Sequence, residues 1–355
     1  MMRIFEHWQQ LVFEEVSLEQ KKVGTIFTRH SRERQEGSEM RRGVSGHRFH
    51  EHVQAVIDEI GIADPREAIR IKARSKIAVF SSLFALPPYD LVAFASCVDL
   101  LWSDVSPAFS QDSEIAPTAD GRVVLRVNQD RPITRQRFSI AHEIGHTLFP
   151  EYQYSVKCRK ATERRWDDDD LLESLCDVAA SEFMFPLPWF SEKLESIEFT
   201  GINLVQLADD CLASREAMAR RIVELSEEPM AAVFFSWKLK PAEEKQARRD
   251  AKQTFMFAEL APEQPIAKLR VDYAIMNEAY RTNDHIHIPK HKSVENSGPI
   301  YQAAISQMPS EGKAALRLGK IETDFDIVAL PIFTEEHEVG PNRASSVVAI
   351  LRPAV

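Results

Sequence analysis

The chain has 355 residues, 44% of them hydrophobic and 9% aromatic, which is enough to build the cores of two modest domains. A formal net charge of -10 argues against a protein whose whole surface is matched to nucleic acid, although it leaves room for a local basic patch. The four cysteines form no C-x-x-C pair, so neither a disulfide framework nor a thiolate zinc site is indicated. With no signal-peptide pattern and no unbroken apolar span, we expect a soluble cytoplasmic protein without a membrane partner.

The first sixty residues are expected to form an extension. Within it, residues 21–50 mix arginine, lysine, histidine and glycine with few apolar residues, which is typical of an exposed basic arm. A solvated arm or linker is the simpler interpretation, because charge runs usually face solvent, and contact with nucleic acid is the alternative.

Residues 61–240 are predicted to form one mainly helical domain with a small sheet. Helices are expected after Asp64, over REAIRIKARSKIAVF, and after Asp90, over LVAFASCVDLLW. The turn signal Asp120-Gly121 precedes RVVLRV, which predicts a short strand.

The same domain continues with a helix over about residues 134–148 and, beyond a polar loop that ends in four aspartates, a second helix over about 171–185. Two short helices, over 204–211 and 214–225, and the strand MAAVFFSW complete the predicted domain.

The charged run KLKPAEEKQARRDAK, residues 238–252, is the expected domain boundary, because it contains almost no bulky apolar side chains. Beyond it, the runs AALRL, FDIVALPIF and SSVVAIL alternate with loops that contain proline, glycine and asparagine. This pattern predicts a separate β-rich α+β domain over residues 241–355, and the whole chain is therefore assigned to the α+β class.

The segment AHEIGHTLF contains an H-E-x-x-H motif on a predicted helix. Residues i and i+4 share one helix face, so His142 and His146 can offer two imidazole nitrogens to one Zn²⁺. Glu143 can then act as the general base for the water that attacks a peptide carbonyl. The spacing thus predicts the catalytic zinc site of a metallopeptidase.

The third ligand is expected on the next helix, where ESLCD places Glu173 and Asp177 on one face. Glu173 is the predicted ligand, and Asp177 is predicted to accept a hydrogen bond from a zinc-bound histidine. Glu182 and the aspartates of residues 167–170 remain competitors for the third position, although solvent-facing charge is the simpler interpretation for each.

Together these segments resemble the ImmA/IrrE family of metallopeptidases. The resemblance is carried by R-x-R-F-S-I-A-H-E-I-G-H-T-L-F and E-S-L-C-D-V-A-A-S-E-F-M-F-P, and it covers roughly residues 85 to 240. It implies a zincin-like fold of the gluzincin type, closed by helix-turn-helix-like helices, with His142, His146 and Glu173 as zinc ligands and Glu143 as the base. Cys176 and Asp177 depart from the alanine and asparagine that are frequent in that family.

The resemblance also implies a substrate. Family members cut a helix-turn-helix transcriptional repressor once, which releases genes for stress response, mobile elements or phage defence. Several carry a sensory domain after the peptidase, and some respond to nucleic acid. A regulatory role for residues 241–355, and single-stranded DNA as an activating signal, are therefore expectations from the resemblance.

Three secondary features are left open by the sequence. The segment LADDCLASREAMARRIVEL can be a DNA-binding helix-turn-helix with Arg215, Arg220 and Arg221 on its second helix, or, more simply, a helix pair that closes the peptidase core. A Cys158 thiolate can occupy the open zinc position and inhibit the enzyme, or the cysteine is inert. The oxyanion donor besides zinc is left open among Tyr152, Tyr154, Arg135 and Arg137.

The main rival to a peptidase is a regulatory docking module that keeps the metal fold and acts by binding its partner, with little or no cleavage. Glu143 favours the enzyme, because a docking protein needs no base beside the metal.

Overall fold

A computed structural model defines the fold. It describes the following residues: 51–84, 86–105, 111–150, 166–254, 265–282, 287–317, 322–332 and 346–354. The predicted basic arm lies outside them. The chain forms two compact units that divide between Glu192 and Lys193, and each is described by itself below.

The first unit begins with helices whose starts are set by aspartate caps. Helix α2 (Glu51–Ile60) precedes α3 (Pro65–Phe80), where the Asp64 carboxylate accepts hydrogen bonds from the Arg66 and Glu67 backbone amides. After the 3-10 turn η1 (Ser81–Leu83), Asp90 caps α4 (Leu91–Cys97) in the same way. Both predicted helix starts are confirmed. They could be predicted from the sequence because a capping side chain bonds to backbone amides only two or three residues away.

A three-stranded sheet follows, in the order β1-β3-β2. Strand β1 (Leu100–Val105) is parallel to β3 (Val123–Asn128), and β2 (Ser113–Pro117) is antiparallel to β3. The strand expected after Asp120-Gly121 is confirmed as β3, and Gly121 has a positive φ of 85° in the turn.

The helix expected over LVAFASCVDLLW is wrong in its second half. It ends at Cys97, Asp99 has a φ of 62°, and the chain enters β1 at Leu100. Leu100 is 1% exposed and pairs with Val123 of β3, so burial in the sheet overrides the helical spacing of the apolar residues.

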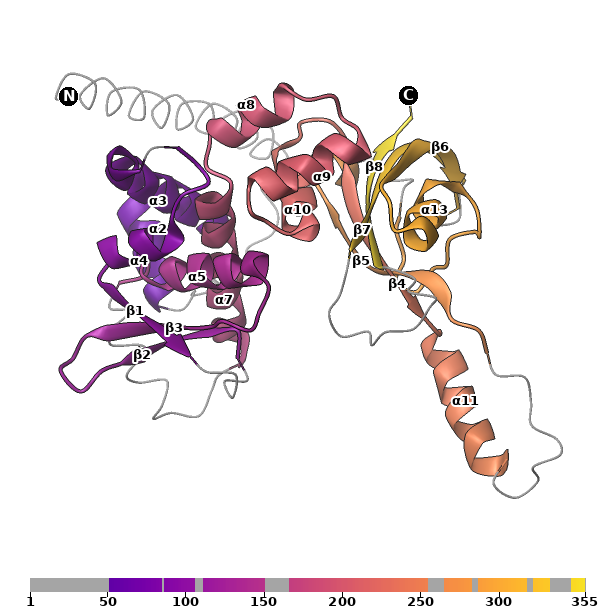
Figure 1. Cartoon of the computed structure of the whole chain (residues 1–355), viewed down its shortest axis with the longest axis horizontal. Helices are drawn as coiled ribbons and strands as arrows, with labels where there is room; N and C mark the ends of the chain where they lie inside the picture. The colour runs from indigo at the N-terminus through magenta and orange to yellow at the C-terminus, as the bar shows by residue number, and fades with distance from the viewer. Residues whose placement is uncertain are drawn as a thin grey trace, which may run out of the picture. The chain divides into compact units, whose positions relative to one another are not determined.

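Two helices then pack side by side, α5 (Ile133–His146) and α7 (Trp166–Met184) (Figure 1). A Cβ atom on Gly145 would lie 3.1 Å from the Cys176 carbonyl oxygen and 3.3 Å from the Ala179 Cβ atom. The glycine therefore permits a close approach of the two backbones. Helix α7 begins at Trp166, five residues earlier than expected.

After α8 (Trp189–Glu195), the second unit starts with α9 (Gly201–Asp210) and α10 (Arg215–Leu225). Strand β4 (Ala231–Lys238) and helix α11 (Pro241–Thr254) follow, then β5 (Lys268–Met276), α12 (Glu278–Arg281) and α13 (Gly298–Ser306). The chain ends in the antiparallel strands β6 (Ser310–Leu316), β7 (Thr323–Ile332) and β8 (Ser346–Pro353). The three C-terminal strands and the helices near 204–225 are thus confirmed.

All five strands form one antiparallel sheet in the order β5-β4-β8-β7-β6. Ala231, Val233 and Phe235 share a hydrophobic core with residues of α13. The alternate residue Phe234 lies under the Arg220 guanidinium of α10 on the opposite face. Helices therefore cover both faces of this sheet (Figure 1), and this explains why its central strands are continuous apolar runs in the sequence.

The expected domain boundary near residue 240 needs correction. The run 238–252 is mostly helix α11, and the strands on either side of it, β4 and β5, are paired in the same sheet. Helices α9 and α10 also belong to this second unit and pack on its sheet, rather than closing the peptidase core. A low content of apolar residues marked an exposed helix here, not a linker.

The candidate DNA-contacting arginines of α10 bind within the second unit instead. Arg215 donates a 2.5 Å hydrogen bond to the Pro331 carbonyl oxygen, and Arg220 donates to Glu216 and to the Tyr273 hydroxyl. Arg221 is 1% exposed and pairs with Glu224 at 3.0 Å. These contacts favour a packing role within the second unit over a DNA-binding role, although the pair does not close the peptidase core as expected.

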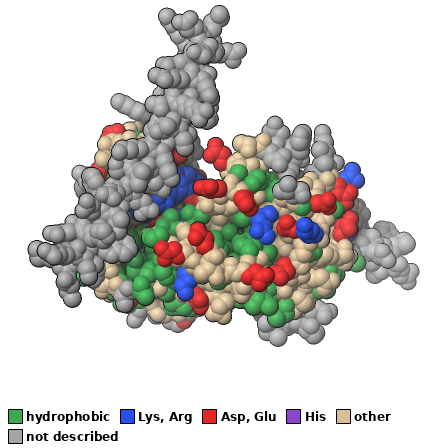
Figure 2. Space-filling view, turned by 90° about the horizontal axis from the view of Figure 1, so that it is seen from above, with side chains coloured by type: hydrophobic (Ala, Val, Ile, Leu, Met, Phe, Trp, Pro, Cys, Tyr) green, Lys and Arg blue, Asp and Glu red, His purple; other side chains and the backbone are tan. Residues whose placement is uncertain are grey.

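Among the described residues, no helix combines the length and apolar character needed to cross a bilayer. On the face drawn in Figure 2, acidic and basic side chains are interspersed, with hydrophobic side chains between them.

Candidate metal centre

Helix α5 carries the H-E-x-x-H motif on its last turn and a half, where the helix is packed between the sheet and α7. His146 and Glu143 are buried, and the His142 side chain is about one-fifth exposed, at 18%. The rings of His142 and His146 lie 5.0 Å apart between centroids, as expected for residues i and i+4 on one face. The predicted arrangement of the two imidazoles is therefore present.

Glu173 of α7 faces both imidazoles. Its Oε2 atom lies 3.0 Å from His142 Nε2 and 3.7 Å from His146 Nε2. Two nitrogens and one carboxylate oxygen thus converge from adjacent helices. Metal–ligand bonds of 2.0–2.1 Å at tetrahedral angles give ligand separations of about 3.3 Å, a value that lies between the two observed distances. The donor set fits a zinc ion in both type and spacing.

Asp177 lies one turn further along α7, on the other side of the His142 ring. Its Oδ1 atom is 2.9 Å from His142 Nδ1. Burial lowers the pKa of His142, but hydrogen bonds to Asp177 and Glu173, with the nearby charge of Glu143, outweigh it and raise that pKa to about 10. The ring therefore lies in a strongly negative environment, which is also one that stabilises a metal cation.

Glu143 is held on the strand side of α5. Ser113, the first residue of β2, donates a 2.8 Å hydrogen bond from its hydroxyl to Glu143 Oε1. The other oxygen, Oε2, lies 4.0 Å from His146 Nε2. No sequence pattern predicts a strand over residues 113–117 or a role for Ser113, because its contact with Glu143 joins residues thirty positions apart.

Cys176 gives a second possible donor set. The nearest ligand atoms of His142, His146 and Cys176 all lie within 4.8 Å of one another. The Cys176 sulfur, however, lies 3.4 Å from His146 Nδ1, whereas Glu173 faces His146 Nε2. Because the two ring nitrogens point in different directions, the carboxylate set, in which both Nε2 atoms face one oxygen, is the more coherent of the two.

The competing carboxylates are placed differently. Glu182 is fully buried and accepts a 3.0 Å hydrogen bond from Arg74 Nε of α3, so it is paired away from the histidines. The aspartates of residues 167–170 lie in the first turns of α7. Cys158, the predicted inhibitory thiolate, lies outside the described residues.

The candidate oxyanion donors are only partly described. Arg137 is buried and donates to the Tyr89 carbonyl oxygen through both terminal nitrogens, and Arg135 binds the Asp112 carboxylate at 2.7 Å. Both arginines therefore stabilise the segments around α5. Tyr152 and Tyr154 lie outside the described residues.

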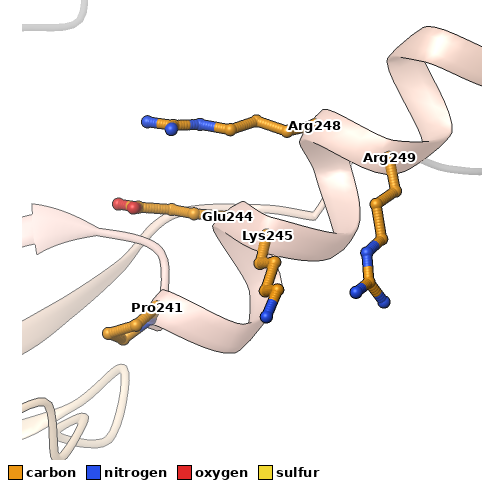
Figure 3. A pocket seen from close by; sticks show the side chains of 5 residues that line it. All are labelled: Pro241, Glu244, Lys245, Arg248 and Arg249. Carbon is orange, nitrogen blue, oxygen red and sulfur yellow. The ribbon is translucent and has the colours of Figure 1, made fainter.

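A surface pocket lies elsewhere, along helix α11 (Figure 3). It is lined by Pro241, Glu244, Lys245, Arg248 and Arg249. Glu244 and Arg248 extend toward one side of the helix, and Lys245 and Arg249 extend toward another (Figure 3). None of the predicted site residues lines this pocket.

The segment that carries these residues is similar to known proteins. The family model for the IrrE N-terminal-like domain, a peptidase family, matches residues 106–223. The chain is 28% identical over 206 residues to the radiation response metalloprotease IrrE of Deinococcus radiodurans, which covers 56% of this chain and 60% of that protein. The chain thus spans less than two thirds of the curated relative that it matches.

Among solved structures, the chain resembles a transcriptional regulator of Mycobacterium tuberculosis, with a TM-score of 0.50 and 12% identity over 84% of this chain and 80% of the other. This likeness concerns the fold alone. The matched residues include both α5 and α7, whose histidines and carboxylates converge, and this similarity to a metalloprotease is consistent with a metal cofactor. Residues 106–223 therefore resemble the peptidase domain of the ImmA/IrrE family of metallopeptidases.

Proposed function

We propose that this chain is a zinc-dependent endopeptidase that makes one site-specific cut in a helix-turn-helix transcriptional repressor. Relief of that repression would induce a stress or phage-defence response in the cytoplasm. The observation that carries the proposal is the convergence of His142 Nε2, His146 Nε2 and Glu173 Oε2, with the Glu143 carboxylate beside them.

The assigned ligands are His142, His146 and Glu173, in a gluzincin arrangement. Zn²⁺ bound there would polarise a peptide carbonyl and lower the pKa of a bound water to near neutrality. Three protein ligands leave a position open for substrate, whereas a purely structural site is normally closed by four. The donor set therefore supports catalysis over a structural role.

The remaining residues handle protons and orientation. Glu143 Oε2 lies 4.0 Å from His146 Nε2 and would take a proton from the attacking water, then pass it to the leaving amine. Asp177 would accept the Nδ1 proton of His142 and so keep its Nε2 lone pair directed at the metal.

A protein substrate is supported by the sheet beside the site. Strand β2 packs near α5 and, among the described strands, pairs on one edge only, with β3. An extended polypeptide can pair with such an edge through its backbone. That geometry favours a peptide bond as the target.

Single-stranded DNA is retained as a candidate activating signal, and residues 241–355 as a candidate regulatory region. The arginines of α10 give no support to a DNA-binding helix there, because Arg215, Arg220 and Arg221 all have partners within the second unit. A DNA response would therefore need other groups.

The test uses the purified, zinc-loaded full chain and the helix-turn-helix protein encoded by a neighbouring gene. The two are incubated with and without single-stranded DNA, and fragments are identified by mass spectrometry. Glu143→Gln is the control variant, and we expect it to keep zinc while cleavage falls by about 10²–10⁴-fold, the usual contribution of a general base.

Discrete fragments that the Glu143→Gln protein does not produce would support the endopeptidase, and dependence on DNA would identify the signal. If the wild-type chain and the Glu143→Gln variant both form a stable complex with the repressor and neither produces fragments, the docking module is favoured instead.

A further inference from the structure

We propose that Ser113 is a positioning residue for Glu143: its hydroxyl holds one carboxylate oxygen and leaves the other directed at the metal ligands. This inference rests on the proposed role of Glu143 as the base. It concerns the 2.8 Å hydrogen bond from Ser113 Oγ to Glu143 Oε1.

The hydrogen bond gives the two oxygens of the Glu143 carboxylate different roles. Oε1 accepts from Ser113, and Oε2 lies 4.0 Å from His146 Nε2, on the side where the ligand nitrogens converge. The Glu143 side chain is buried, so a rotation of the carboxylate would leave an oxygen without its hydrogen bond in a poorly hydrated place. A fixed carboxylate keeps the accepting oxygen in one position during the reaction.

Ser113 is itself held firmly. The preceding residue, Asp112, binds Arg131 Nε at 2.8 Å and Arg135 Nε at 2.7 Å, and Arg135 belongs to α5 itself. The Asp112 carbonyl oxygen accepts from the Asn128 amide, and Ser113 pairs with Val127 of β3. The start of β2 is thus tied both to the sheet and to the helix that carries the base.

The alternative is that Ser113 only stabilises the β2–α5 packing. The two roles differ in one respect. A positioning residue acts through Glu143, so its replacement should not change probe affinity once the carboxylate has been removed. A packing residue should lower the affinity equally whether or not the Glu143 carboxylate is present.

The experiment is a double-mutant cycle of Ser113→Ala and Glu143→Gln in the full chain loaded with Co²⁺. Acetohydroxamate is the probe, and its binding is followed in the visible spectrum. The probe binds a metal through its two oxygens, and its hydroxyl proton can pass to a neighbouring carboxylate, so its affinity reports on the base without any protein substrate.

We expect Ser113→Ala to weaken acetohydroxamate binding about tenfold, the effect of losing one hydrogen bond to a charged group. In the Glu143→Gln background the same change should have no effect. Ser113→Thr, which keeps the hydroxyl, should restore binding. Glu114→Gln is the matched control, because Glu114 lies on the opposite face of β2 and bonds to Arg126, and it should bind the probe normally.

Equal losses from Ser113→Ala in both backgrounds, or no loss in either, would overturn the proposal. The cleavage reaction gives an independent readout, in which Ser113→Ala should lower kcat and leave KM unchanged. If the wild-type chain cleaves no repressor but the probe cycle still shows coupling, the proposed substrate fails and the positioning role stands.

Discussion

The middle and the C-terminal end of helix α7 present acidic side chains in different ways. Near its middle, Glu173 and Asp177 are 45% and 58% exposed and face the two nitrogens of the His142 ring. Nearer the C-terminal end, Glu182 is 0% exposed and is paired with Arg74 and Arg70 of α3. One helix thus carries two carboxylates of the proposed metal site and one carboxylate that is buried in the packing.

The difference shows that the partner, and not burial alone, decides the role of an acidic residue. A buried carboxylate needs cationic partners that compensate for its lost hydration, and the arginines of α3 supply them to Glu182. Glu173 instead shares its oxygen between two imidazoles, which are neutral when they bind a metal. Variants in these two parts of α7 should therefore separate metal affinity from folding stability.

The largest expected effect on metal binding is that of Glu173→Gln. An amide cannot replace the charged ligand, so zinc affinity should fall by more than about 100-fold. That is the largest loss of affinity usually seen when a residue that only orients a ligand is replaced. The free energy of unfolding of the metal-free protein, measured in the presence of chelator, should change by less than about 1 kcal/mol, because the Glu173 side chain is partly exposed. Chelator competition and urea unfolding measure the two quantities, and tight zinc binding by the variant would assign the third ligand elsewhere.

The opposite result is expected for Arg74→Ala. Removal of this partner leaves Glu182 buried with less compensating charge, so unfolding free energy should fall by about 3 kcal/mol. Zinc affinity should remain that of the wild type. Arg66→Ala is the matched control, because Arg66 also links α3 to α7, through Ser174, at an exposed position. A similar stability loss in both variants would contradict a special role for the buried pair.

A smaller effect is expected for Asp177→Ala, which removes the acceptor at His142 Nδ1. Zinc affinity should fall about 10–100-fold. Asp177→Asn should recover much of this loss, because the amide oxygen still accepts the hydrogen bond. If the alanine variant binds zinc as tightly as the wild type, Asp177 is only a surface residue.

The smallest effect is expected for Cys176→Ala. The Cys176 sulfur contacts His146 Nδ1, so the change should leave zinc stoichiometry at one and lower stability by roughly 1 kcal/mol through lost packing. The Co²⁺-loaded wild type should show no sulfur-to-metal charge-transfer absorption in the near ultraviolet. A band that disappears in Cys176→Ala would make the cysteine a ligand in place of Glu173.

Local signals in the sequence were sufficient for several helices and for the motif. Asp64, Asp90 and Ser214 each bond to backbone amides two or three residues away, so they identify helix starts without any tertiary information. In the same way, the four-residue spacing of His142 and His146 determines by itself that the rings share a face.

Features that depend on distant partners were not accessible in this way. The apolar run after Cys97 fits a helix by its spacing, and only the pairing of β1 with β3 makes it a strand. Helices α9 and α10 were assigned to the peptidase core, but the sheet of the second unit covers them. Apolar faces show that a segment is buried, and they do not show against what.

The sequence alone therefore determined the α+β class and the helix that carries the metal motif. It also indicated Glu173 and Asp177 as the candidate acidic partners of that motif. The tertiary structure decided that Glu182 pairs with Arg74 and not with a histidine, that Cys176 lies against His146 Nδ1, and that Ser113 binds Glu143. The physical reason is range: caps and helical spacing act over a few residues, whereas these contacts join side chains thirty to more than one hundred positions apart, which only packing brings together.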